Sequence, residues 1–354
     1  MELSAIGLLQ SAVQSGASDL FIVTGLPAST RLHGNIVQIN DQRLMPEDTE
    51  VLLKEIYSLA NGRSMDGLHL SGDDDFSFAV PGLSRFRASA YKQRNTLSIV
   101  IRVITFDLPD PSQLGIPEKI ISFANFPKGM VLITGSAGSG KSTSLACIID
   151  YINQHYEKHI ITLEDPLEFL HRHHKSIVSQ REINVDTESY VTALRAALRQ
   201  SPDVILLGEM RDYETIQVAM TAAETGHLLF STLHTVGAAN TIDRIIDVFP
   251  PNQQGQIAVQ LSMVLQAVVS QQLVPTVDGD LTPAFEIITV TPAIRNMIRE
   301  NKIPQLEGVL YSSANADMVS MDMSLLNLYN SRRITADTAL SFATNPDMLK
   351  KRLR

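Results

Sequence analysis

The sequence predicts an α/β protein with two domains, the second of them built on a parallel β-sheet. The chain has 354 residues, which at roughly 150 residues per domain corresponds to two domains. Beyond residue 117, short apolar runs alternate with helical stretches as far as about residue 290, the pattern of a parallel sheet with crossover helices. A glycine-rich loop joins one of these apolar runs to the helix that follows it.

The composition is that of a globular protein without membrane spans. Hydrophobic residues make up 44% of the chain and charged residues 19%. The single cysteine, Cys147, excludes an intramolecular disulfide and a cysteine-rich zinc site. The longest apolar stretches contain Gln or Ser, and the first residues lack the positive start of a secretory signal. We therefore expect a cytoplasmic protein.

The formal charge of −9 argues against a protein whose main role is to bind nucleic acid. It follows from 29 Lys and Arg against 38 Asp and Glu. Binding to a phosphate backbone draws on counterion release by Lys and Arg, so such proteins are more often net basic. We expect no nucleic-acid partner, although an acidic net charge does not exclude a local basic channel.

Residues 1–106 are predicted to form a small domain that mixes helices and strands. Leu3, Ile6, Leu9 and Val13 recur at helical spacing, and Gly16 follows as a stop signal. A second helix is expected over about residues 46–61. The strand-like runs are residues 20–23, 29–32, 35–39, 75–80, 84–92 and 96–104.

Residues 107–117 carry three prolines and a glycine in the sequence DLPDPSQLGIP. Proline restricts its own φ angle and the residue before it, so this stretch is not expected inside a helix or a sheet. An ordered loop and an interdomain linker both fit, and we favour the linker. Residues 118–290 then form the second domain, and residues 291–354 are predicted to be mostly helical.

A phosphate-binding loop stands at the start of the second domain. The apolar run 129–134 leads into GSAGSGKST at residues 135–143, which matches G-x-x-x-x-G-K-[ST], and a helix follows over 144–154. Backbone N–H groups of such a loop converge on a β-phosphate, Lys141 reaches the β and γ oxygens, and the Ser142 hydroxyl can bind Mg²⁺. The predicted phosphate-binding residues are Gly135, Ser136, Ala137, Gly138, Ser139, Gly140, Lys141, Ser142 and Thr143.

Two further strand-like runs end in carboxylates. Residues 160–163 run into Glu164, and residues 203–207 run into Gly208 and Glu209. Ligands of open α/β sheets bind beyond the carboxyl ends of the strands, so both carboxylates can face the phosphates. We expect Glu164 to polarise an attacking water, and Glu209 to hold Mg²⁺ through water and to help orient that nucleophile. The alternative is that either carboxylate caps a loop or pairs with Arg211.

Histidines occur at one more strand end and in one cluster. The run 228–233 ends at His234, where an imidazole can donate a hydrogen bond to a γ-phosphate or to Glu209. His227, at the other end of the run, is a weaker candidate. Residues 171–175 (HRHHK) lack partners at metal-ligand spacing, so we expect a solvated surface or an electrostatic partner patch.

Together these motifs resemble the secretion-ATPase superfamily, and most closely the PilT-like twitching motility ATPases that power type IV pilus retraction. The four family motifs, namely the Walker A, Asp box, Walker B and His box, occur in the expected order within five central matches, and the similarity extends over nearly the whole chain. The central matches are GSAGSGKST (135–143), ITLEDPLEF (161–169), SQREI (179–183), LRAALRQSPDVILLGEMRDYET (194–215) and TAAETGHLLFSTLHT (221–235). The outer matches are ASDLF (17–21), RFRASAY (85–91), TIDRIIDVFP (241–250), VVSQQLVP (268–275) and PAIRNMIRE (292–300).

The resemblance implies a hexameric ring ATPase that uses ATP and Mg²⁺. Its subunit would have a PAS-like N-terminal domain, a RecA-like core with ATP between the two, and C-terminal helices. Arg87 and Arg102, with Arg85 as a lesser candidate, would reach the γ-phosphate from the N-terminal domain. The implied place is the cytoplasmic face of the inner membrane, where the ring would be held through an inner-membrane pilus platform protein.

The resemblance also implies a partner-binding motif at PAIRNMIRE. We expect its apolar residues to pack and Arg295, Arg299 and Glu300 to stay free for a partner. Three positions depart from the family pattern. Phe21 replaces a common histidine, Asn184 replaces a common glycine, and Ala258 stands where a basic residue is expected. Asparagine tolerates a positive φ angle better than most residues, so we expect the turn at Asn184 to be retained.

Four alternative functions remain. One is a nucleotide-binding structural ring with degenerate chemistry, and the intact set Lys141, Ser142, Glu164 and Glu209 argues against it. A pilus-assembly or type II secretion ATPase of the same superfamily usually carries a four-cysteine zinc motif, which a chain with one cysteine cannot build. A retraction accessory paralogue would share all the motifs above. A nucleic-acid motor, such as a helicase or packaging ATPase, belongs to a different class, and the acidic balance of the chain argues against it.

Overall fold

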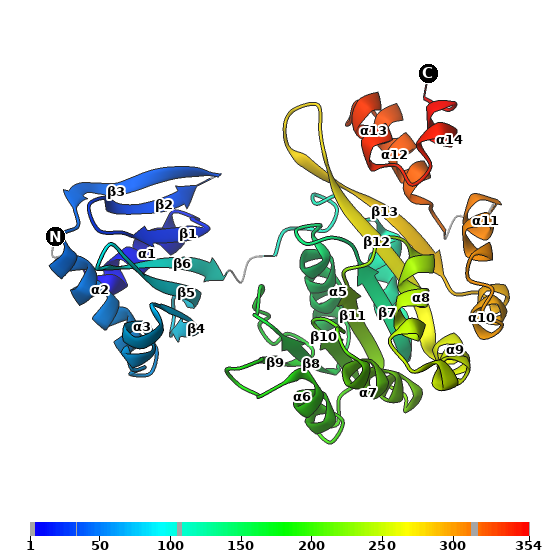
Figure 1. Ribbon diagram of the computed structural model, residues 1–354, viewed down its shortest axis with the longest axis horizontal. Helices are drawn as coiled ribbons and strands as arrows, with labels where there is room; N and C mark the ends of the chain where they lie inside the picture. Colours follow the sequence, from blue (N-terminus) through cyan, green and yellow to red (C-terminus); the bar gives the residue numbers. More distant parts are fainter. Residues whose placement is uncertain (1–3, 33, 105–107, 313–317, 354) are drawn as a thin grey trace. The chain divides into compact units, whose positions relative to one another are not determined.

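The computed structural model describes residues 4–32, 34–104, 108–312 and 318–353, and the chain divides into two compact units (Figure 1). The first unit ends at residue 107 and also includes residues 168–170. The second comprises the rest of the chain from Leu108. No helix within the described ranges has the length and apolar character needed to cross a membrane.

The first unit is a six-stranded antiparallel sheet with three helices. Its strand order is β3-β2-β1-β6-β5-β4. The strands are β1 (Asp19–Ile22), β2 (Pro27–Leu32), β3 (Asn35–Arg43), β4 (Asp73–Val80), β5 (Ser84–Gln93) and β6 (Thr96–Ile104). The helices are α1 (Ala5–Gln14), α2 (Pro46–Leu59) and α3 (Asp66–Ser71). Alternate strand residues such as Phe86, Ala88 and Ile101 are buried with α1 and α2 in one core, which leaves the other set of side chains outside it.

The helices of the first unit begin and end at residues that the sequence marks. The Ser4 hydroxyl accepts a hydrogen bond from the N–H of Gly7 at the start of α1. Helix α1 gives way to Gly16, whose φ angle is +71°. Pro46 occupies the first turn of α2, and the Asp48 carboxylate accepts a hydrogen bond from the N–H of Met45. The two predicted helices are therefore present, with α2 ending two residues earlier than expected.

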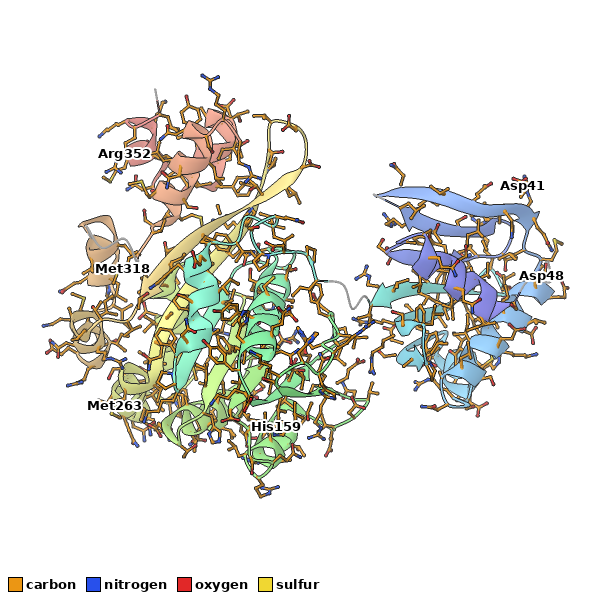
Figure 2. All side chains as sticks on the ribbon, turned by 180° about the vertical axis from the view of Figure 1, so that it is seen from behind. Asp41, Asp48, His159, Met263, Met318 and Arg352 are labelled. Carbon is orange, nitrogen blue, oxygen red and sulfur yellow. The ribbon has the colours of Figure 1, made fainter. Side chains whose placement is uncertain are left out.

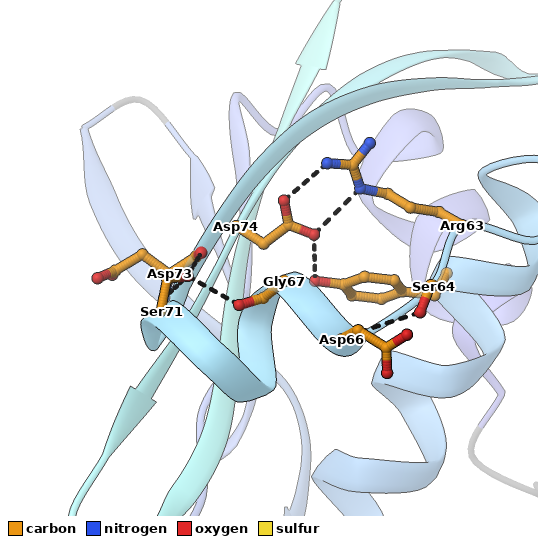
Figure 3. A network of polar contacts seen from close by, with 8 residues as sticks. Arg63, Ser64, Asp66, Gly67, Ser71, Asp73 and Asp74 are labelled. Atoms are coloured by element: carbon orange, nitrogen blue, oxygen red, sulfur yellow. Dashed lines mark hydrogen bonds and ion pairs between the residues drawn. The ribbon is translucent and has the colours of Figure 1, made fainter.

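A polar network joins the C-terminal end of α2 to strand β4 (Figure 3). Arg63 donates from Nε and Nη2 to the two oxygens of Asp74, at 3.0 and 2.8 Å. The Tyr57 hydroxyl donates to the same carboxylate at 2.9 Å. The Arg63 guanidinium also lies over the ring of Phe76, 5.1 Å from its centroid. The hydrogen bond from Arg63 lowers the pKa of Asp74, so the carboxylate stays charged and the contact fixes the strand against the helix.

The second unit is a seven-stranded sheet with helices on both faces. Its strand order is β13-β12-β7-β11-β10-β8-β9, and all neighbouring pairs are parallel except β12 and β13. The strands are β7 (Gly129–Thr134), β8 (His159–Glu164), β9 (Ile177–Glu182), β10 (Val204–Leu207), β11 (Leu228–Leu233), β12 (Leu265–Pro275) and β13 (Leu281–Thr289). Residues 276–280 between β12 and β13 are too few for a crossover, so the last strand returns antiparallel.

Helices cover both faces of this sheet with apolar side chains (Figure 2). The first face carries α4 (Glu118–Ile121), the 3₁₀ turn η1 (Ser122–Asn125) and α5 (Lys141–His155). The second face carries α6 (Tyr190–Ala197), α7 (Tyr213–Glu224), α8 (Ala238–Asp247), α9 (Pro251–Val264), α10 (Pro292–Arg299) and α11 (Gln305–Ser312). The last helices, α12 (Met321–Asn330), α13 (Ala336–Phe342) and α14 (Pro346–Lys350), share a small core with Val274 and Ala284.

The stretch for which we favoured a linker is part of the second unit from Leu108 onward. Leu108 and Leu114 pack against the core beneath α5, and Ile116 is buried. Residues 105–107 lie outside the described residues. Residues 108–117 therefore form a loop whose leucine and isoleucine side chains pack on the second unit, and the linker over residues 107–117 stays a prediction.

Candidate functional site

The loop between β7 and α5 has the conformation that only its glycines permit. Gly135, Gly138 and Gly140 have φ angles of +143°, +74° and +86°. A Cβ atom on Gly135 would lie 2.2 Å from the carbonyl oxygen of Gln271, so no side chain fits there. By contrast, a Cβ on Gly138 would meet nothing within 4 Å. The loop is thus pressed against the sheet at Gly135 and open to a ligand at its tip.

Lys141 lies across this loop. Its ammonium group donates to the carbonyl oxygens of Gly135 and Ser136, at 2.9 and 2.8 Å. The Ser139 hydroxyl is buried without a hydrogen-bond partner among the described residues. Helix α5 starts at Lys141 and runs for 15 residues, so its positive dipole end points into the loop. A cation, an unused hydroxyl and a helix start together fit the oxygens of a phosphate.

Two strand ends bring Glu164 and Glu209 close to each other. Strands β8 and β10 are paired with Leu163 opposite Leu207, so Glu164 and Gly208 follow side by side. The N–H of Gly208 donates to the carbonyl of Leu163 at 2.8 Å, and a Cβ on Gly208 would lie 3.4 Å from the Cα of Glu164. The missing side chain at position 208 lets the two acidic strand ends approach.

Glu209 has two partners. Its Oε1 atom lies 2.6 Å from Arg211 Nη2, and its Oε2 atom lies 3.2 Å from His234 Nε2. The Glu209 side chain is mostly buried, with a relative exposure of 11%, whereas Arg211 is 73% exposed. The pairing with Arg211 that we left open as an alternative is therefore present, and so is a contact between His234 and Glu209. Hydrogen bonding to Glu209 in turn raises the pKa of Arg211.

Four carboxyl strand ends therefore meet at one edge of the second unit. The central strands lie in the order β7, β11, β10, β8, and they end at the phosphate loop, His234, Glu209 and Glu164. His227 precedes β11 instead of following it, and its Nδ1 atom contacts the carbonyl of Ala222 at 2.9 Å. The structure thus groups His234 with the site and leaves His227 at the opposite edge of the sheet.

Tyr190 is a residue of this site that the sequence reasoning missed. It stands in the first turn of α6, which Ser189 caps by accepting a hydrogen bond from the N–H of Thr192. Its hydroxyl would lie 2.9 Å from a Cβ on Gly208. Burial raises the pKa of Tyr190, and the charges of Glu209, Asp165 and Glu164 raise it further. The Tyr190 hydroxyl therefore lies near the acidic strand ends in its neutral form.

Comparison with known proteins identifies the family. Residues 3–317 match the family model described as type II/IV secretion system protein. The chain belongs to this family. The structure of the pilus retraction motor PilT with bound ADP is similar over 99% of this chain and all of that one, with a TM-score of 0.90 and 43% identity. That match confirms the expected fold: a parallel-sheet core, a smaller domain before it and helices after it.

Relatives within the family are similar over almost their whole length. The type IV pilus retraction ATPase PilT of Pseudomonas aeruginosa is 42% identical over 340 residues, covering 96% of this chain and 98% of that protein. A twitching motility protein of Neisseria gonorrhoeae is 42% identical over 348 residues, with coverage of 98% and 92%. The type IV pilus ATPase PilU of P. aeruginosa is 38% identical, with coverage of 97% and 89%. The resemblance drawn from the motifs is thereby confirmed.

The arginines that the family resemblance singled out lie on the first unit. Arg87 on β5 stands directly opposite Arg102 on β6, so the two side chains share one face of the sheet, and both are exposed. Arg102 Nε lies 3.2 Å from an Asp19 oxygen, and Arg31 Nε lies 3.4 Å from the other. Arg85, two residues earlier on β5, is half-buried. Arg87 and Arg102 thus form a basic surface that Asp19 helps to order.

The Asn184 turn and the histidine cluster have simple structural explanations. Asn184 has a φ angle of +65°, so the asparagine supports the turn as expected. In the cluster, the buried Asn153 side chain donates to the carbonyl of Arg172 at 2.7 Å and accepts from the N–H of His174 at 3.1 Å. Residues 172–175 are exposed, and burial lowers the pKa of the half-buried His171.

The motif at α10 differs from our expectation in one residue. Ile294 and Ile298 pack into the core, as expected. Arg295, however, donates to the carbonyls of Ser262 and Met263, at 2.6 and 2.9 Å, and to the Gln266 side chain at 3.1 Å. These are groups at the end of α9 and the start of β12. Arg295 therefore caps the C-terminal end of α9 and is not the free charge that we expected.

The other two charges of that motif remain at the surface. Glu300 accepts a hydrogen bond from Asn296 at 2.9 Å and pairs with Lys302 at 2.6 Å, and Arg299 is exposed.

Proposed function

We propose that this chain is an ATP-hydrolysing motor that drives type IV pilus retraction. The observation that carries the proposal is the gathering of four strand ends at one edge of the second unit, in a chain 42% identical over nearly its full length to the PilT retraction ATPase. Phosphoryl transfer to water needs groups of these kinds: a phosphate-binding loop, carboxylates and a histidine. The solved PilT structure contains ADP, which supports ATP and ADP as the ligands of this site.

The nucleotide is held by the loop from Gly135 to Thr143. Backbone N–H groups and the start of α5 face the phosphates, and Lys141 exchanges its two carbonyl partners for phosphate oxygens. The unpartnered Ser139 hydroxyl gains an acceptor. Ser142, and Glu209 through water, would hold Mg²⁺, which supplies charge neutralisation between the β and γ phosphates.

Hydrolysis itself rests on three side chains of the second unit. Glu164 accepts a proton from the attacking water and orients it. Glu209 supports the orientation of the water, and it would hold Mg²⁺ through water. His234 Nε2 lies 3.2 Å from Glu209 and can donate a hydrogen bond to the γ-phosphate or to that carboxylate. The Arg211 guanidinium, 2.6 Å from Glu209 Oε1, is a cation that would compete with a bound Mg²⁺ for the negative charge of this carboxylate.

The first domain contributes charge and movement. Arg87 and Arg102 neutralise the charge that develops on the γ-phosphate, so turnover depends on the position of the domain that carries them. The motor works as a hexameric ring at the cytoplasmic face of the inner membrane and acts on the pilus through an inner-membrane platform protein. The full-length similarity to PilT supports these assignments.

A second candidate function is that of an accessory retraction ATPase. It is favoured by the 38% identity to PilU over 97% of the chain. Type II secretion protein E of Klebsiella pneumoniae, by contrast, matches only 42% of this chain and 28% of its own length. Similarity therefore favours retraction over secretion or assembly, and it gives no support to a nucleic-acid motor.

The test combines a phosphate-release assay with a gene deletion. The purified protein should release phosphate from ATP, and replacement of Lys141 by alanine should abolish that activity. Deletion in a piliated host should give hyperpiliated cells that do not twitch, whereas an accessory ATPase would leave twitching partly intact. Bald cells, or ATP turnover that requires DNA, would contradict the proposal.

A further inference from the structure

Gln271 lies directly behind the phosphate-binding loop. Strand β12 runs parallel to β7 with Ser270 opposite Thr134, so Gln271 is level with Gly135. The side chains of β12 alternate between the two faces of the sheet. Ala267 and Val269 point toward α5, whereas the Ser270 hydroxyl accepts a hydrogen bond from the N–H of Gly237 on the other face. Gln271 therefore points toward α5 and the loop.

Both ends of the loop touch Gln271. The carbonyl oxygen of Gln271 would lie 2.2 Å from a Cβ on Gly135, and its side-chain nitrogen would lie 2.8 Å from a Cβ on Gly140. Neither glycine could be replaced without displacing β12 or the Gln271 amide. The loop thus packs on a single residue. Its first glycine, Gly135, lies against the main chain of Gln271, and its last glycine, Gly140, lies against the Gln271 side chain.

The Gln271 side chain is fixed in this place. Its Oε1 atom accepts a hydrogen bond of 2.8 Å from the Ser144 hydroxyl in the first turn of α5. Ser144 has no exposed surface and Gln271 is 2% exposed, so this bond is shielded from water. A buried hydrogen bond between fixed elements orients both partners. The contact links β12 to the helix start that presents Lys141 and Ser142.

A neutral amide suits this position. A glutamate would have nearly the same shape and could still accept from Ser144, but it would place a negative charge behind the loop that receives phosphates. The carboxylate of such a glutamate and the phosphates in the loop would repel each other strongly, because little water separates them. A methionine would fill the same volume and lose the hydrogen bond.

We infer that Gln271 is a positioning residue for nucleotide phosphates, acting through its contacts with Gly140 and Ser144. The inference rests on the proposed nucleotide hydrolysis at this site. Gln271 touches no phosphate itself. It holds the last glycine of the loop and the first turn of α5 in the arrangement that binds the phosphates of ADP or ATP.

The experiment measures binding of a fluorescent ADP analogue by the full-length chain and its variants. Gln271→Met should weaken binding roughly fivefold, about the value of one hydrogen bond. Gln271→Glu should weaken it roughly tenfold or more, because the shape is kept and a like charge is added. Ser144→Ala should resemble Gln271→Met and add little to it in the double variant. With ATP, the Michaelis constant should rise more than kcat falls.

Gln272→Met is the matched control, since the neighbouring side chain is half-buried and its amide lies 3.5 Å from the carbonyl of Phe342, away from the loop. Its ADP affinity should equal that of the original chain. Melting temperatures without nucleotide separate positioning from folding. Unchanged ADP affinity in both the Gln271→Glu and Ser144→Ala proteins would overturn the inference, as would a loss that merely follows melting temperature. An original chain that binds no ADP would overturn the proposed function, and this inference with it.

Discussion

Arg211 Nη2 lies 2.6 Å from Glu209 Oε1, so the carboxylate assigned to magnesium is already paired with a cation. Arg211 is largely exposed, and the free energy that such an ion pair contributes is small because water screens it. Arg211→Ala should therefore lower the Mg²⁺ concentration that gives half-maximal ATP hydrolysis, by about threefold. A magnesium titration of the phosphate-release rate measures this. A higher magnesium requirement would mean that Arg211 supports the metal site.

Glu164 should be essential for turnover and dispensable for binding. Removing a general base typically costs roughly 10²- to 10⁴-fold in rate, so Glu164→Gln should release almost no phosphate. Its affinity for ADP should stay within about twofold, because the amide keeps the shape of the side chain at the end of β8. Glu157→Gln, at an exposed position just before β8, is the control and should behave as the original chain. Turnover at the original rate would remove Glu164 from the mechanism.

Tyr190→Phe tests the hydroxyl that lies near the acidic strand ends. The ring that packs against the second unit's core is retained, so the melting temperature should change little. The phosphate-release rate should fall about tenfold, because a neutral polar group is removed from beside the charges of Glu209 and Glu164. An equal rate for both proteins would make Tyr190 a packing residue only.

The arrangement of the strand ends could be predicted from the sequence because each end is a local pattern. An apolar run followed by Glu164, Glu209 or His234 is visible in a few consecutive letters. Contacts between distant segments could not be predicted. Ser144 and Gln271 are 127 residues apart in the chain, and no spacing rule connects them. The same holds for Arg295, whose partners belong to another helix end. The antiparallel direction of β13 could not be predicted either, because it follows from the short loop before it, and the length of that loop is clear only once the limits of both strands are known.

Asp74 should make the stability of the first unit depend on pH. Arg63 lowers the pKa of Asp74 in the folded protein, so folding is favoured where the carboxylate is charged. This contribution is present above the unfolded pKa of about 4 and is lost as the pH falls through the lower folded value. Asp74→Asn should cost about 1–3 kcal/mol in the free energy of unfolding at pH 7, and the difference should shrink below pH 4. The exposed Asp75→Asn, one residue along β4, is the control. A difference that is constant with pH would contradict the role of the charge.

Arg295 and Arg299 stand one helical turn apart on α10, and they should separate folding from partner binding. Arg295→Ala leaves the carbonyls of Ser262 and Met263 without their donor, so the free energy of unfolding of the second unit should fall by about 1.5–3 kcal/mol. Arg299 is exposed, and Arg299→Ala should change stability by less than about 0.5 kcal/mol and keep full ATP hydrolysis. If α10 presents a surface to a pilus component, Arg299→Ala should reduce twitching in cells while the purified protein stays active. Normal twitching in that strain would show that Arg299 is not part of such a surface, and would leave Arg295 as the charged residue of the motif with a defined role, that of closing the end of α9.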